Sequence, residues 1–146
     1  MRALRKNKQK MNYALFKESV PVYEKDEQGN PIVDFVDEQG NTFYRETGSN
    51  KDVYYAPVEF FASISSNLNE MRATEYGVDP SSIFSEIIAD KGTLPLTFGA
   101  KIWRTSEIQY DSDNDPIPES ADYTVKGVLD EFLNYDFFLL ERITKE

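Results

Sequence analysis

The sequence predicts an all-β fold, a small antiparallel β-barrel or sandwich with at most one short helix. Aromatic residues make up 14% of the chain, and aromatic side chains are enriched in strands. Short apolar segments alternate with polar, turn-forming segments along the whole chain. The length of 146 residues favours one domain, residues 1–146, which is large enough to bury a core.

Composition excludes several classes of chemistry. The chain has no cysteine and no histidine, so it has no disulfide, no thiolate metal site and no nucleophile–histidine triad. The formal net charge is −10, which argues against tight nucleic-acid binding by the body of the fold. No apolar run approaches the roughly 18 residues that span a bilayer, so we expect no membrane segment.

The first ten residues form a basic segment without acids. We treat residues 1–10 as a basic N-terminal arm and residues 11–146 as the barrel body. Three interpretations of the arm remain open: a solvated tail, a segment that docks on an acidic protein partner, or one that contacts a phosphate backbone. The candidate partner-binding residues are Arg2, Arg5, Lys6, Lys8 and Lys10.

The first two strands are expected early in the chain. Met11–Phe16 is the first, and a polar turn separates it from Val20–Glu24. Pro21 places the second strand at an edge or at a strand start, because proline cannot donate a ladder hydrogen bond.

The pentapeptide DEQGN occurs twice, at Asp26–Asn30 and Asp37–Asn41. Gly-Asn within a polar run suits a hairpin turn. The two turns predict a meander with strands at Pro31–Val36 and Thr42–Glu46, closed by a turn at Gly48–Asn50.

The hairpin region 24–52 is rich in acids and poor in apolar residues. We therefore expect it to project from the body as an acidic arm. Its candidate channel or interface residues are Asp26, Glu27, Asp37 and Glu38.

The clearest strand covers residues 58–65. Val58, Phe60, Ala62 and Ile64 alternate with Glu59, Phe61, Ser63 and Ser65. This period of two indicates a strand with one face in a core.

The segments that follow are less uniform. Met71–Tyr76 alternates weakly and ends at Gly77. Asp79 and Pro80 suit a helix cap, and we expect a short turn at Pro80–Ser82. The spacing in Ile83–Ala89 fits a helix or a buried strand, and we favour the strand.

Three further strands are expected in the last third of the chain, giving about nine in all. They are Ala100–Thr105, Ala121–Leu129 and Tyr135–Ile143. In the second of these, alternation places Tyr123, Val125 and Gly127 on one face and Thr124, Lys126 and Val128 on the other.

The loop Tyr110–Ser120 is acidic. Asp111, Asp113 and Asp115 have the spacing of a calcium loop, but Pro116 stands where glycine is needed and Asp122 where a bidentate glutamate is expected. We therefore interpret the segment as a solvated acidic loop, with ion binding as the alternative.

No motif for catalysis stands out. Acids lie mostly in polar loops, and the sequence has no phosphate-binding glycine loop, no G-x-S-x-G and no metal-ligand cluster. We expect no enzymatic activity, no cofactor and no metal.

Three stretches resemble one family. They are LRKNKQKMNYALFKESVPVYEKDEQGN at residues 4–30, YYAPVEFFASIS at residues 54–65 and ADYTVKGV at residues 121–128. In this order they resemble the head-closure, or stopper, proteins of the head-to-tail interface of tailed siphophages that infect Gram-positive hosts.

The resemblance implies a virion structural protein, assembled in the host cytoplasm as a homo-oligomeric ring. Such a ring binds below the portal and adaptor, retains packaged DNA without sequence-specific binding, and offers a docking surface to the tail terminator or tail-completion protein. Two alternatives remain: another neck component, such as an adaptor or tail-completion or terminator protein, or a small non-viral binding module that uses the basic arm.

Overall fold

The structure of the chain is a computed structural model that describes residues 8–66, 68–79 and 83–144. These residues fall into two compact units. Lys17–Val53 forms one, and the residues before and after it form the other.

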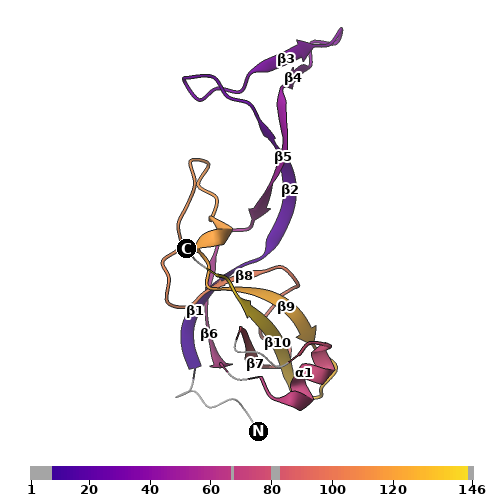
Figure 1. Ribbon diagram of the computed structural model, residues 1–146, viewed down its shortest axis with the longest axis vertical. Helices are drawn as coiled ribbons and strands as arrows, with labels where there is room; N and C mark the ends of the chain where they lie inside the picture. Colours follow the sequence, from indigo (N-terminus) through magenta and orange to yellow (C-terminus); the bar gives the residue numbers. More distant parts are fainter. Residues whose placement is uncertain (1–7, 67, 80–82, 145–146) are drawn as a thin grey trace. The chain divides into compact units, whose positions relative to one another are not determined.

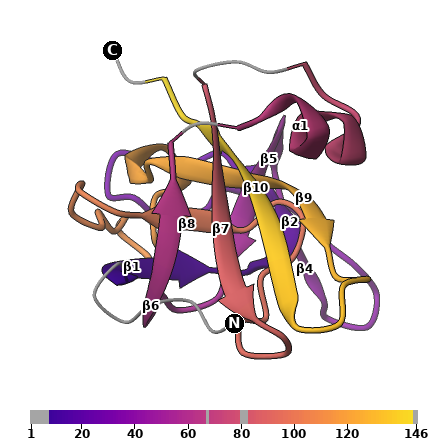
Figure 2. The same ribbon diagram turned by 90° about the horizontal axis from the view of Figure 1, so that it is seen from below.

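The larger unit is a closed six-stranded antiparallel barrel (Figure 2). The strand order is β1-β6-β7-β10-β9-β8, and β1 closes the barrel by pairing with both β6 and β8. The all-β prediction is confirmed. The strands are β1 Lys8–Ala14, β6 Val58–Ser65, β7 Phe84–Asp90, β8 Lys101–Trp103, β9 Tyr123–Leu129 and β10 Tyr135–Arg142.

The interior of the barrel is a single apolar cluster. In β6, Phe60 and Ala62 are buried and Ile64 packs against them, as the alternation predicted. Val58, at the start of the strand, is 46% exposed. Other buried members of the cluster are Met11, Ile87, Ala89, Leu96, Ala100, Ile102, Val125, Phe138 and Leu140.

The ambiguous segment at residues 83–89 is a strand, as favoured. In β7, Ile87 and Ala89 face the interior, whereas Glu86 lies on the outer face and pairs there with helix α1. The helical alternative is wrong, because a period of two is what lines the barrel interior.

The one α-helix among the described residues is α1, Glu70–Tyr76, in the segment whose alternation was weak. The Asn69 side chain caps it by accepting from Arg72 N at 2.7 Å, and Gly77 ends it in the left-handed conformation with φ 77°. The expected turn at Pro80–Ser82 lies outside the described residues. No helix in the described part of the chain is long and apolar enough to cross a membrane.

Helix α1 packs on the outer face of the barrel through a polar network. Glu86 accepts a hydrogen bond from the Tyr76 hydroxyl at 2.8 Å and pairs with Arg72 Nε at 3.1 Å. The Arg72 guanidinium lies 3.8 Å from the centre of the Phe137 ring, a cation–π contact. Burial, and next the charge of Glu86, raises the pKa of Tyr76, which keeps its hydroxyl a donor.

A β-bulge changes the faces of β9. The register against β10 shifts between Leu139 and Leu140, where Lys126 is the extra residue. Val128 therefore packs against the interior cluster, and the prediction that it shares a face with Lys126 is wrong. Strict alternation cannot show an inserted residue.

The smaller unit contains two separate two-stranded sheets. Strand β2, Phe16–Tyr23, pairs with β5, Glu46–Tyr54, and β3, Val33–Val36, pairs with β4, Thr42–Tyr44 (Figure 1). The expected closing turn at Gly48–Asn50 is wrong, because these residues lie within β5. Gly48 adopts a positive φ of 88° there, and the Thr47 hydroxyl donates to Val22 O at 3.0 Å across the pair.

We predict that Gly127→Ala destabilises the barrel by about 1–3 kcal/mol. A Cβ at this position would lie 2.9 Å from Tyr76 Cδ1, so the helix would have to shift. Chemical denaturation measures the loss, with the adjacent, exposed Lys126→Ala as control. Equal stability of the two variants would contradict this packing.

Candidate functional site

Three turns of the chain share one geometry, although the sequence analysis found only two. They are Asp26–Asn30, Asp37–Asn41 and Asp111–Asp115. In each, Oδ1 of the first aspartate accepts hydrogen bonds from the backbone N–H groups two and four residues later, at 2.8–3.0 Å. The fourth residue has a positive φ: 84° at Gly29, 85° at Gly40 and 63° at Asn114.

The third copy has a sequence signal that was missed. Its segment, DSDND, keeps aspartate first, a residue that tolerates positive φ fourth, and asparagine or aspartate fifth. Pro31 and Pro116 follow the first and third copies, and each forms an isolated bridge across its turn. The repeat is therefore a turn motif, and identity of all five residues was too strict a criterion.

This geometry separates the predicted interface acids into two kinds. Asp26 and Asp37 hold their own turns together, and hydrogen bonds from Asn41, backbone first, lower the pKa of Asp37. Glu27 and Glu38, the second residues of these turns, are exposed, and within the described chain no hydrogen bond or ion pair engages their carboxylates.

The third turn brings Asp111, Asp113 and Asp115 together. One carboxylate oxygen of each lies within 4.8 Å of the others. Such oxygens suit a hard cation such as Ca²⁺, but Asp111 Oδ1 is already an acceptor for two backbone N–H groups. The turn geometry therefore accounts for the spacing that resembles a calcium loop.

The structure divides the candidate basic residues. Arg2, Arg5 and Lys6 lie outside the described residues. Lys8 and Lys10 belong to β1, which begins three residues before the expected start at Met11. Lys10 Nζ lies 3.3 Å from Glu59 Oε2 on the neighbouring strand, an exposed pair of the kind that adds little stability.

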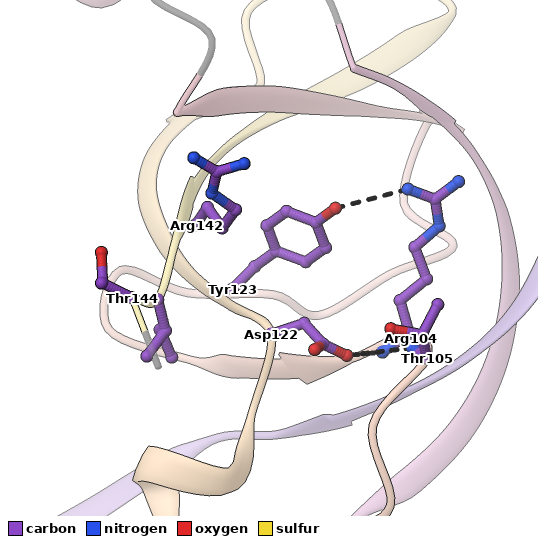
Figure 3. Close-up of a pocket in the computed structure, with 7 residues that line it drawn as sticks. Arg104, Thr105, Asp122, Tyr123, Arg142 and Thr144 are labelled. Carbon is purple, nitrogen blue, oxygen red and sulfur yellow. Dashed lines mark hydrogen bonds between the residues drawn. The ribbon is translucent and has the colours of Figure 1, made fainter. Parts of the chain in front are cut away.

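A pocket of about 510 Å³ lies where β8 and β10 end and β9 begins (Figure 3). Sequence analysis did not find it, because its residues come from three separated segments. Its lining residues are Arg104, Thr105, Asp122, Tyr123, Arg142, Ile143 and Thr144.

The two arginines give the pocket its character. Arg104 donates from Nε to Gln9 Oε1 at 2.8 Å and from Nη1 to the Tyr123 hydroxyl at 3.3 Å. Both acceptors are neutral. The exposed guanidinium of Arg142 has no hydrogen-bond or ion-pair partner among the residues that the structure describes. Figure 3 shows Tyr123 between the two arginine side chains.

Asp122 organises the loop that carries Arg104. Its Oδ2 accepts from the backbone N–H groups of Arg104, Thr105 and Ser106 at 2.8–3.0 Å, and its Oδ1 accepts from the Ser106 hydroxyl at 2.6 Å. Burial opposes ionisation, but these hydrogen bonds outweigh it and lower the pKa of Asp122 well below the ordinary value. Asp122, the one acid among the lining residues, is thus ionised, and its oxygens accept hydrogen bonds from its own loop. The charged side chains that the pocket offers to a ligand are therefore the two arginines.

Comparisons of the chain with protein-family models, with curated proteins and with solved structures find no match.

We predict that Asp122→Asn costs about 1–3 kcal/mol of stability near neutral pH. The folded-state pKa is lowered, so the contribution of Asp122 is present above its ordinary pKa of 3.8 and is lost as pH falls below it. Chemical denaturation measures the free energy of unfolding of the native protein and the variant at each pH. The difference between them should be constant near neutral pH and should shrink as the pH falls below 3.8. Exposed Glu119→Gln is the control, and a difference that grows in acid would contradict the assignment.

We predict that Asn114→Gly matches or exceeds the native stability, whereas Asn114→Ala loses about 1–2 kcal/mol. The positive φ of Asn114 is free of strain for glycine and strained for alanine. Thermal unfolding compares the two variants in one turn, and alanine proving better than glycine would contradict the shared turn geometry.

Proposed function

We propose that this chain is a structural protein of the neck of a tailed phage, a head-closure component that assembles as a ring below the portal and adaptor. The proposal starts from the resemblance of residues 4–30, 54–65 and 121–128 to that family. The structural observation that supports it most strongly is a closed barrel combined with a second unit that has exposed apolar side chains.

The exposed apolar side chains belong to the hairpin β3–β4. All seven residues of its two strands are exposed, and the Phe35 and Phe43 rings stack at 4.7 Å on its surface. An isolated two-stranded hairpin is marginally stable, and contiguous apolar surface commonly marks an interaction site. A protein that works inside an assembly would cover this surface with a neighbour.

The charge of the chain fits a role beside packaged DNA. A net charge of −10 repels phosphate, so DNA can be retained without being bound. Repulsion across a narrow channel is screened less than it is at an open surface. On this proposal the protein is a barrier and a docking surface, with no catalytic role and no cofactor, and it is located in the virion.

A phage that lacks this chain should fill its heads with DNA and then lose the DNA, because the channel below the portal stays open. The heads should also remain without tails. Nuclease sensitivity of the DNA measures its loss, and electron microscopy shows whether tails are attached. Addition of the native chain should restore both DNA retention and tail attachment. Stable, tailed particles without the chain would refute the proposal.

Substituting Arg2, Arg5 and Lys6 by serine separates the neck protein from a nucleic-acid-binding module. These positions precede β1, so its pairing with β6 is left intact. Salt-dependent DNA binding that disappears in this variant would favour the binding module; unchanged, weak DNA affinity fits the neck protein.

A further inference from the structure

The pocket lined by Arg104 and Arg142 presents guanidinium donors, the groups that suit an oxyanion. Arginine presents a planar fork of donors that matches a carboxylate or a phosphate. Arg104 is held by two neutral acceptors, and Arg142 has no partner in the described chain. In a chain with 26 acids and 16 bases, it is notable that two arginines line one pocket and that neither forms an ion pair with a described acid.

The chain also carries a matching donor of negative charge. Glu38 is the second residue of the turn that joins β3 to β4, and it is exposed and without a partner among the described residues. Asp37 fixes the turn through its own hydrogen bonds, so the Glu38 carboxylate is presented on an ordered support. The stacked Phe35 and Phe43 lie on the two strands that this turn joins.

From this complementarity we propose that the Arg104–Arg142 pocket binds the Glu38 turn of a second copy of the chain. The carboxylate pairs with guanidinium donors that line the pocket, and the exposed apolar residues of β3–β4 cover surface around it. Protein carboxylate is favoured over DNA phosphate, because the overall negative charge repels a free polyanion, whereas a turn is held by its neighbouring apolar contacts.

The contact joins two different surfaces, so it is heterologous. Contacts of this kind generate a ring when the rotation between copies closes, and a filament when it does not. The pairing itself is independent of the proposed function; only its closure into a ring rests on head closure.

Disulfide trapping tests the contact directly, because the chain has no cysteine of its own. One chain carries Gln39→Cys, next to Glu38, and a second, differently tagged chain carries Thr144→Cys at the pocket. Mixed under mild oxidation, they should form a disulfide-linked dimer that carries both tags. Adding Glu38→Arg to the first chain, or Arg104→Gln and Arg142→Gln to the second, should lower its yield on the order of tenfold.

The repeated turn supplies a matched control. Glu27 has the same position in an identical pentapeptide, but the turn at 26–30 is not flanked by the β3–β4 strands. Glu27→Arg in the Gln39→Cys chain should leave the dimer yield unchanged. A chain that carries Ser112→Cys, an exposed position in the third turn, in place of Gln39→Cys gives the background level of random collision.

The proposal is overturned if the dimer yield is no higher than the Ser112→Cys background, or if Glu38→Arg does not lower it. It is also overturned if Glu27→Arg lowers the dimer yield as much as Glu38→Arg does. A fourth contrary result is ready cross-linking, at high dilution, within one chain that carries both cysteines. Duplex DNA that blocks the trapping, and whose binding disappears with Arg104→Gln and Arg142→Gln, would assign the pocket to phosphate instead. If no disulfide-linked dimer forms but the phage still requires the chain to close its heads, the result disproves this contact alone and not the proposed function.

Discussion

The closure of the barrel by β1 is the constraint on which the rest of the larger unit depends. Residues 8–13 of this strand pair with β6, and residues 12–14 pair with β8, so β1 joins the two ends of an otherwise open sheet. Closure removes the unpaired edges that make open sheets prone to aggregation. It also encloses one interior cluster, in which Met11 from β1 is 1% exposed.

The outer face of the barrel then receives two polar attachments. Helix α1 is held by Arg72, Tyr76 and Glu86, and the segment after β8 is folded around the Asp122 carboxylate. In both, a charged group is stabilised by several donors or by aromatic rings, which is what a half-buried charge requires. The hydrogen bonds of Asp122 fix the segment that carries Arg104, whose side chain donates to Tyr123. Asp122 therefore shapes the pocket, whereas the positive charge of the pocket comes from its arginines.

The sequence was informative wherever one physical signal dominated. Alternation located residues 58–65 as a strand with Phe60 and Ala62 inside, and the strands expected at residues 83–89 and 135–143 correspond to β7 and β10. Helix α1 was missed because a seven-residue helix shows only two turns of periodicity, although Asn69 and Gly77 mark its ends. Neither the bulge beside Gly127 nor the pocket could be predicted from the sequence, because both arise where segments distant in the sequence come together.

The proposed role of this chain in closing the phage neck is tested most directly by its binding to purified portal–adaptor complexes. Electron cryomicroscopy of the mixture should show an added ring of barrels below the adaptor, with density narrowing the channel. Portal–adaptor complexes that remain bare at saturating chain concentration, while other neck proteins attach to them, would contradict the account.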